Sequence, residues 1–260
     1  MTAPNTSTAQ DPADTVLETR DPQHEGAVTL RINRPSVKNA VGPREVTRLR
    51  ESLLRLQVDP TVRIIFLTGT GDTFTAGADI NELNRLSGDA MSSFIETQVD
   101  LLNHIVLSPK IVVAAVNGVS AGLGNHIITC CDLAYIKDTA VLHFTGASKA
   151  LPSLLMGPLL MPMTIGLKKA KSLYLRGGRR SAHEAVSEGL CNEAIAPADW
   201  QRHLDEIASE FTGRSASTMA HNKFQLNQSA FQLVGASKLS GLAGALSMSQ
   251  ATDIPTGRVK

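Results

Sequence analysis

The sequence predicts one α/β domain with a mostly parallel sheet, followed by a helical C-terminal third. Two features of the 260-residue chain carry this prediction. Near-continuous apolar runs at residues 62–67 and 111–116 are typical of strands that are covered on both faces. Segments with helical spacing alternate with such runs, as the crossovers of a parallel sheet do. With 42% apolar residues, the chain has enough hydrophobic side chains for one sizeable core.

The N-terminal elements follow from local patterns. Residues 16–20 and 27–32 are rich in apolar residues and are separated by turn residues, which predicts a hairpin. From Pro43 onward apolar residues recur at helical spacing, and proline is favoured in the first turn of a helix. The buried strand at 62–67 then ends at a Thr-Gly-Thr-Gly turn.

The same alternation continues through the middle of the chain. A helix is predicted over about 90–107, the next buried strand over 111–116, and a second helix up to Cys130. Two short strands are predicted at 133–136 and 141–144. The rest of the chain is mostly helical in character and is punctuated by glycine turn signals.

Composition excludes several classes of partner. The 25 Lys and Arg residues balance 24 Asp and Glu residues, so the net charge is +1 and no basic surface for nucleic acid or membrane is expected. No apolar stretch reaches the roughly 20 residues of a membrane span. Three cysteines form neither a disulfide framework nor a metal-binding pattern, so we expect a reducing, cytoplasmic location and no metal. Residues 1–14 are expected to be a disordered tail.

Two segments rich in small residues are the first candidates for chemistry. Residues 74–80 and 117–124 each follow a buried strand and stand where a helix should begin. A helix N-terminus offers unpaired N–H groups and a partial positive charge. Two such ends at one edge of a sheet would form a pair of donors suited to an oxyanion. The alternative is that the glycines serve only tight turns and close packing.

Four motifs resemble those of the crotonase superfamily, the enoyl-CoA hydratase/isomerase family. They occur in the order and at the spacing of that family, and the likeness runs from about residue 16 to about residue 227. The motifs are Asn33-Arg34-Pro35 with Lys38-Asn39-Ala40, then residues 74–80, then Ala115-Val116-Asn117-Gly118, and finally Cys131-Asp132.

The resemblance implies a crotonase (ClpP/crotonase-like) fold of stacked ββα units with a helical C-terminal region. It divides the chain into a tail at 1–14, an α/β core at 15–200 and a helical trimerisation region at 201–260. It also implies a homotrimer or dimer of trimers that binds an acyl-CoA thioester, with coenzyme A as part of the substrate and no separate cofactor.

The resemblance further assigns roles to individual residues. The main-chain N–H groups of Ala78 and Leu123 would hold the thioester oxygen while an enolate forms, each donor contributing roughly 3 kcal/mol in other systems. Positions that match the lining of the family's CoA and substrate channel are Arg34, Lys38, Ala40, Ala76, Gly77, Asp79, Ile80 and Gly122. A lysine that often follows Asp-Ile in the family is Asn81 here.

The catalytic carboxylates of the family are missing. The first hydratase glutamate aligns with His126, the second falls at about Gly146, and the isomerase glutamate falls near Ser153 or Leu154. Because helical side chains lean toward the helix N-terminus, the imidazole of His126 should cover the turn that carries the Leu123 N–H. We expect it to act as general acid or base. The alternative is a hydrogen-bonded wall residue in a pocket that binds without turnover.

Other polar and sulfur-containing residues carry weaker hypotheses. His143 and Asp132 are expected to be structural, and Ser153 has no evident base beside it. Three methionines are expected to line an apolar wall or to fill the core, namely Met156, Met161 and Met163. Three histidines are expected at the surface without metal-ligand spacing, namely His183, His203 and His221.

Three functions therefore remain open at the level of sequence. The first is a lyase or isomerase of the enoyl-CoA hydratase/isomerase type. The second is a β-diketone C–C hydrolase on a non-CoA substrate, which is suggested by the missing glutamates and by a C-terminal segment, 252–260, without the family's aromatic and basic cluster. The third is an acyl-CoA binding protein without catalytic activity. A second titratable group within reach of His126 would favour an enzyme, and an apolar pocket would favour a binder.

Overall fold

The computed structural model describes residues 14–145 and 155–249, with side chains described up to residue 244. Most of the predicted tail at 1–14 therefore lies outside the described residues. The same holds for Gly146, Ser153, Leu154 and the segment 252–260.

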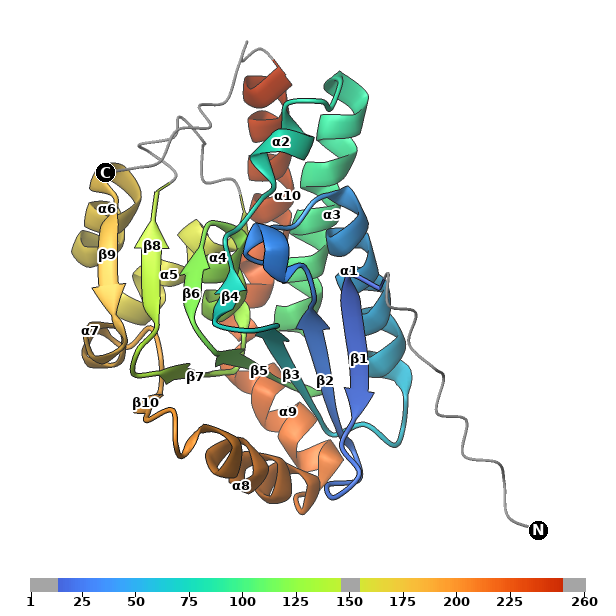
Figure 1. Ribbon diagram of the computed structural model, residues 1–260. Helices are drawn as coiled ribbons and strands as arrows, with labels where there is room; N and C mark the ends of the chain where they lie inside the picture. The colour runs from blue at the N-terminus through green and yellow to red at the C-terminus, as the bar shows by residue number, and fades with distance from the viewer. Residues whose placement is uncertain (1–13, 146–154, 250–260) are drawn as a thin grey trace.

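Two sheets form the centre of the molecule (Figure 1). The larger sheet contains, in spatial order, β1 (Val16–Arg20), β2 (Ala27–Ile32), β3 (Ile64–Gly69), β5 (Ile111–Val116), β7 (Leu133–Lys137) and β10 (Glu193–Ile195). The smaller sheet contains β4 (Thr73–Thr75), β6 (Val119–Ala121), β8 (Val141–Phe144) and β9 (Gly178–Ser181). Among the described strands, β1–β2 and β8–β9 are the antiparallel pairs and the other pairs are parallel, so the prediction of a mostly parallel arrangement is confirmed.

Helices connect the strands and make up most of the C-terminal region. The described helices are the 3-10 turn η1 (Pro35–Val37), α1 (Pro43–Val58), α2 (Ile80–Leu83), α3 (Gly88–Leu107), α4 (Leu123–Cys130), α5 (Met156–Ile165), α6 (Leu167–Arg176), α7 (Ala182–Glu188), α8 (Trp200–Thr212), α9 (Ala216–Leu226) and α10 (Gln228–Ser249). None of the helices in the described ranges is both long and apolar enough to cross a membrane.

A repeated ββα order explains the two sheets. In each repeat the first strand joins the large sheet, the next strand joins the small sheet, and a helix follows, as in β3–β4–α2 and β5–β6–α4. The stacked ββα units and the helical C-terminal region are therefore present as expected. The parallel pair β4–β6 is the part of this order that positions the site, because both strands deliver the chain to the same edge.

The large sheet separates two hydrophobic clusters, which explains its continuous apolar strands. Ile65 and Leu67 of β3 face the main cluster with α1 and α3, whereas Ile64 and Phe66 face a second cluster with α8. Burial of each such side chain contributes about 1.5–3 kcal/mol. The predicted strand at 62–67 is shifted because Val62, although fully buried, lies in the loop that precedes β3.

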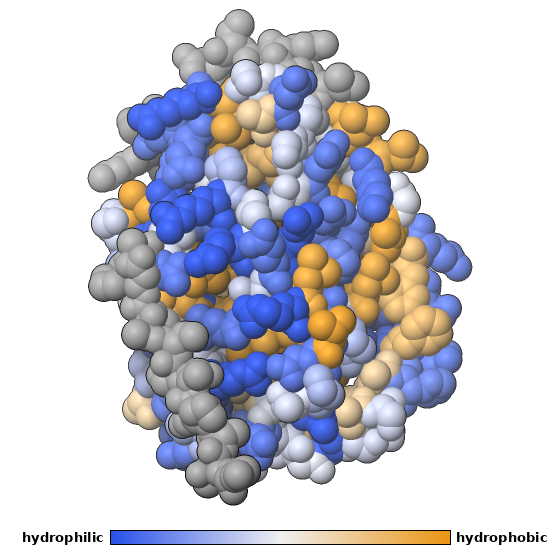
Figure 2. Space-filling model, turned by 90° about the vertical axis from the view of Figure 1, so that its right-hand side faces the viewer, coloured by the Kyte–Doolittle hydropathy of each residue, from blue (hydrophilic) through white to orange (hydrophobic). Residues whose placement is uncertain are grey.

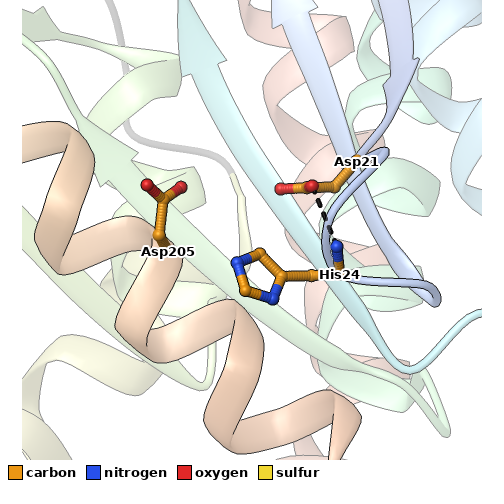
Figure 3. A group of neighbouring side chains, drawn as sticks. All are labelled: Asp21, His24 and Asp205. Atoms are coloured by element: carbon orange, nitrogen blue, oxygen red, sulfur yellow. Dashed lines mark hydrogen bonds between the residues drawn. The ribbon is translucent and has the colours of Figure 1, made fainter.

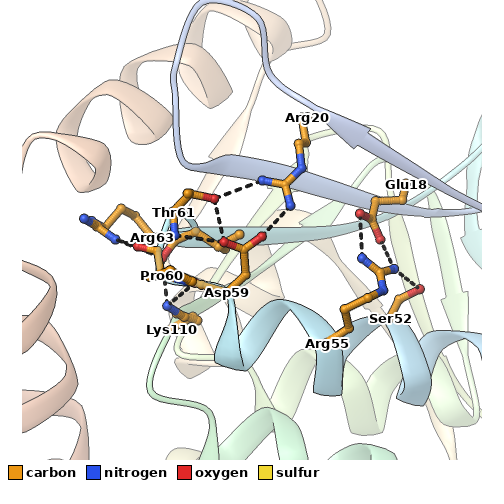
Figure 4. Close-up of polar contacts among 10 residues, drawn as sticks. Glu18, Arg20, Ser52, Arg55, Asp59, Pro60, Thr61, Arg63 and Lys110 are labelled. Atoms are coloured by element: carbon orange, nitrogen blue, oxygen red, sulfur yellow. Dashed lines mark hydrogen bonds and ion pairs between the residues drawn. The ribbon is translucent and has the colours of Figure 1, made fainter. Parts of the chain in front are cut away.

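Polar contacts at the surface tie the outer strand to α1 (Figure 4). Arg20 of β1 donates to the Asp59 carboxylate over 2.6 Å, and Arg55 of α1 donates to Glu18 of β1 over 2.6 and 3.1 Å. Hydrogen bonds from Thr61 and Arg20 hold the pKa of Asp59 well below its usual range. Figure 2 shows one face of the molecule on which hydrophilic residues surround several patches of apolar side chains.

A buried ion pair anchors the C-terminal helices to the sheet. The ammonium of Lys223 on α9, 5% exposed, donates to Asp132 over 2.7 Å and to the carbonyls of Ile105 and Lys110. Asp132 also accepts from the Val112 N–H over 2.7 Å. Burial raises the pKa of Asp132, while the neighbouring Lys223 opposes that shift. The structural role expected of Asp132 agrees with this geometry.

Removing one partner of this pair should be costly. Asp132→Ala leaves the Lys223 charge buried without a counter-ion, so we expect the free energy of unfolding to fall by about 3–5 kcal/mol in urea titrations. Glu206→Ala is the matched control, because Arg202 and Glu206 on α8 pair with more than half of each side chain exposed. That control should cost less than about 1 kcal/mol, and equal losses in the two variants would contradict the assignment.

Candidate active site

Two glycine turns meet where β4 and β6 end. Gly77 has φ +89° and Gly122 has φ +53°, which favour glycine at both positions. A Cβ on Gly77 would lie 2.8 Å from the Ala121 carbonyl oxygen and 3.2 Å from the Gly122 Cα. A Cβ on Gly122 would lie 3.5 Å from the Gly77 Cα and 4.0 Å from the Ala78 nitrogen. The two backbones are therefore in direct contact, as expected for a pair of facing donors.

The residues on both sides of Ala78 are hydrogen-bonded to Val41, whereas the N–H of Ala78 has no acceptor among the described residues. Val41 donates its N–H to the Gly77 carbonyl over 2.9 Å and accepts from the Asp79 N–H over 2.9 Å. The Gly77 N–H donates to Thr75 Oγ1 over 3.0 Å. Among the described residues, no acceptor is found for the N–H of Ala78 itself.

Leu123 supplies the matching donor from the first position of α4. Gly122, the N-cap, has no side chain to accept from the first turn, and its carbonyl accepts from the N–H groups of Asn125 and His126. The Leu123 N–H has no acceptor within the described part of the chain, as is usual at a helix start. Its side chain is buried in the main core. The sequence-predicted pair Ala78 and Leu123 is thus brought together at one edge.

His126 lies on the same helix and is almost completely buried. Burial lowers the pKa of His126 to about 4, and Nδ1 has no hydrogen-bond partner among the described residues. The ring is therefore neutral at pH 7, in contrast to the near-neutral titration that an exposed histidine would show. The Tyr174 ring of α6 lies 6.1 Å from it, centroid to centroid.

The surroundings of His126 are poor in titratable groups. Burial raises the pKa of Tyr174 above its usual value, and the nearby Cys130 adds to that shift. Neither side chain hydrogen-bonds His126 in the described part of the structure. An acid/base partner of the kind that a family glutamate would provide is thus not found in the described residues around the ring. By the criterion set from the sequence, this part of the site matches the expectation for a binding protein more than that for an enzyme.

The residues expected at the CoA channel fall into two groups. Arg34 is engaged in the fold, because its guanidinium contacts the Ala40 carbonyl and the carboxylates of Glu45, Asp79 and Glu82 over 2.8–3.4 Å. Lys38, by contrast, is exposed in a left-handed turn at φ +54°, and its ammonium has no partner among the described residues. Of these two side chains, Lys38 is therefore the one whose charge is not engaged within the described residues.

The other channel positions differ in exposure. Ala76 is exposed and Ile80 half-buried, whereas Ala40 and the carboxylate of Asp79, which caps α2, are buried. Asn81, where the family often has lysine, contributes its N–H to this cap over 3.1 Å.

Several weaker expectations can also be compared with the structure. Met156 and Met161 are fully buried core residues, whereas Met163 is 58% exposed. His203 is not a surface residue, because its ring packs edge-on against Tyr135 with centroids 4.8 Å apart. His143 is half-buried in β8 with its carbonyl bound by the Asn125 side chain. His183 and His221 are exposed as expected.

One group of potential metal ligands was not predicted from the sequence. Asp21, His24 and Asp205 each offer one ligand atom, and these atoms lie within 4.8 Å of one another (Figure 3). The pair Asp21 and His24 is visible in the sequence, but Asp205 reaches it from α8 only through the fold. Asp21 already accepts from two backbone N–H groups and Asp205 from the side chain of Gln201, so both carboxylates have partners without an ion.

The comparison with known families decides the identity. The sequence model described as enoyl-CoA hydratase/isomerase matches residues 23–251. The chain belongs to this family. Among enoyl-CoA hydratase/isomerase relatives, YngF of Bacillus subtilis (strain 168) is 31% identical over 219 residues, covering 83% of this chain and 82% of YngF. The crystal structure of an enoyl-CoA hydratase/isomerase from Mycobacterium paratuberculosis has a TM-score of 0.85 at 29% identity, covering 92% of this chain and 95% of the other.

Membership of the enoyl-CoA hydratase/isomerase family does not by itself fix the reaction. The 4-chlorobenzoyl coenzyme A dehalogenase-2 of Arthrobacter sp is 30% identical over 191 residues, covering 72% of this chain and 69% of the dehalogenase. Two relatives with similar sequence identity to this chain are thus named for different reactions, but both names refer to a coenzyme A thioester as the substrate.

The glycine contact can be tested by paired substitutions. Gly77→Ala places a Cβ against the Ala121 carbonyl at a positive φ, so we expect it to lower both stability and turnover. Gly71→Ala is the control, since Gly71 has φ +77° but nothing within 4 Å of its Cβ position. We expect the free energy of unfolding to fall by about 1–2 kcal/mol in Gly71→Ala, the cost of a Cβ at positive φ, and by clearly more in Gly77→Ala, as measured by thermal unfolding. Equal losses would show that the contact is not tight.

Proposed function

We propose that the protein acts on an acyl-CoA thioester whose carbonyl oxygen is held by the main-chain N–H groups of Ala78 and Leu123. The observation that carries the proposal is the direct contact between the Gly77 and Gly122 backbones, with both following N–H groups left without acceptors in the described residues. Donors fixed where negative charge develops stabilise an enolate without reorganisation. The relatives' names support a coenzyme A thioester as the substrate class.

His126 is the side chain that contacts the reacting group in this proposal, as a general acid or base or as a hydrogen-bond donor. It lies one helical turn after Leu123, so its side chain leans back over the turn that carries the donor N–H. It stands where the family's first hydratase glutamate aligns, and it is the one ionisable side chain of α4 with a basic nitrogen. Lys38 would meet a phosphate of the CoA moiety from the exposed turn that precedes α1.

A substrate panel tests the proposal. The full-length protein is incubated with 2-enoyl-CoA, 3-enoyl-CoA and cyclic β-diketone substrates, and products are identified by mass spectrometry. Hydrated or isomerised acyl-CoA supports the proposal. Diketone cleavage without CoA binding would replace it with a C–C hydrolase, and CoA-ester binding without any product would replace it with a binding protein.

Removal of one donor gives a quantitative prediction. Leu123→Pro deletes the N–H at the first helical position, where proline is tolerated. We expect kcat to fall by about 10²–10³. Leu123→Ala loses the buried side chain but keeps the N–H, so the ratio of the two kcat values measures the donor alone. A ratio near one, with both variants folded by circular dichroism, would contradict the oxyanion role.

A homotrimer or dimer of trimers is part of the proposal. Four exposed apolar side chains on α9 and α10 support a protein interface there, namely Phe224, Leu226, Leu239 and Leu242. Light scattering after gel filtration should give three or six times the 27.7 kDa chain mass. Leu226→Glu, at a side chain 83% exposed, should reduce that mass. A monomer in the unmodified protein would contradict this part.

A further inference from the structure

The imidazole of His126 packs against the first turn of α5. Gly157, the second residue of that ten-residue helix, touches the ring with its backbone. A Cβ at Gly157 would lie 2.2 Å from His126 Nδ1, 3.0 Å from Cγ and 3.1 Å from Cε1. Glycine is therefore the one residue that leaves room for the ring in this position.

This packing determines which ring nitrogen is available to hydrogen-bond a ligand. Nδ1 is enclosed and has no partner among the described residues, and His126 as a whole is 8% exposed. No backbone N–H of α5 reaches Nδ1 in the described part of the structure. A proton on Nδ1 would be a buried donor without an acceptor, which is rarer in proteins than a buried acceptor without a donor. The neutral tautomer with its proton on Nε2 is thus favoured.

The charges around the ring also favour the neutral form. Helix α5, Met156–Ile165, contains no titratable side chain. Among the described residues, the titratable groups near the ring are Tyr174 of α6 and Cys130 on the same helix as His126. Burial raises the pKa of both, so both are neutral at pH 7. Burial also lowers the pKa of His126 to about 4.

We propose that His126 acts as a neutral hydrogen-bond donor through Nε2–H, a third donor to the thioester oxyanion beside Ala78 and Leu123, and that Gly157 is the positioning residue that holds it so. This inference rests on the proposed function and narrows it, because it makes His126 a hydrogen-bond donor and not a general base. A neutral imidazole gives up no proton in the ground state, and its hydrogen bond strengthens as charge develops on the oxygen. A base with so low a pKa would be inefficient at neutral pH.

The tautomer can be measured without substrate. Long-range ¹H–¹⁵N spectra of the labelled protein distinguish a protonated ring nitrogen from one with a lone pair, and His126→Ala assigns the signal among the seven histidines. We expect a proton on Nε2 and no titration of His126 between pH 5 and 8. A proton on Nδ1, or an imidazolium that forms near pH 6.5, would overturn the proposal whatever the activity.

Two substitutions at His126 separate a donor from a base. Glutamine places an amide N–H₂ near the position of Nε2 but cannot take up a proton at neutral pH. On the acyl-CoA that the panel identifies, we expect His126→Ala to lower kcat about 100-fold with a smaller change in KM. We expect His126→Gln to recover at least 10-fold of that loss. No recovery would overturn the donor role. If His126→Ala is silent while Leu123→Pro is not, this inference fails and the proposed oxyanion pair stands.

A double-mutant cycle tests Gly157. Gly157→Ala displaces the ring, so it should lower kcat and move the pKa of His126 upward toward 6.5. In the His126→Ala background the added methyl enters space that the ring has left, and it should lower neither kcat nor Tm further. Gly235→Ala on α10, with nothing within 4 Å of its Cβ position, is the control and should leave kcat unchanged. Equal effects of Gly157→Ala in both backgrounds would overturn the positioning role.

Discussion

The contact between the Gly77 and Gly122 backbones is the constraint on which the site depends. It exists because β4 and β6 pair in parallel and release the chain at the same edge of the small sheet. The absence of side chains at both positions lets two turns touch that residues with a Cβ would hold apart. The bridge between Val41 and the loop around Ala78 then fixes one donor, and the start of α4 fixes the other. Each ββα repeat thus contributes one N–H group to the pair.

Burial decides what the remaining polar group can do. The family's carboxylates would bring charge and proton transfer to this edge, whereas His126 sits among apolar elements that keep it neutral. The Gly157 backbone lies against the ring, so a residue with a Cβ does not fit there while the imidazole keeps this position. In the proposed function, a site built in this way would polarise a carbonyl through fixed dipoles, and proton transfers would come from the substrate or from bound water. Family membership with relatives named for different reactions is compatible with such a division of labour.

Local patterns were sufficient for most of the fold and for the two segments at 74–80 and 117–124, whereas Ala78 and Leu123 as donors came from the family resemblance. The strands β5 and β8 lie where their apolar runs predicted them, and β5 is bounded by Pro109 on one side and by Asn117-Gly118 on the other. β3 was displaced because Val62 is buried for packing reasons without being in a strand. The environments of Gly157, His203 and Asp205 could not be predicted, since each depends on a contact with a segment distant in sequence. The same is true of Arg34, whose acidic partners come from separate helices.

The central claim is that fixed main-chain donors polarise a thioester carbonyl at this edge. Isotope-edited infrared difference spectra of a bound acyl-CoA, labelled with ¹³C at the thioester carbonyl, test this most directly. The account predicts that the carbonyl stretch moves to lower frequency on binding, and that the shift shrinks in Leu123→Pro but persists in Leu123→Ala. A bound carbonyl with the frequency of the free ester in water, or a shift indifferent to Leu123→Pro, would contradict it.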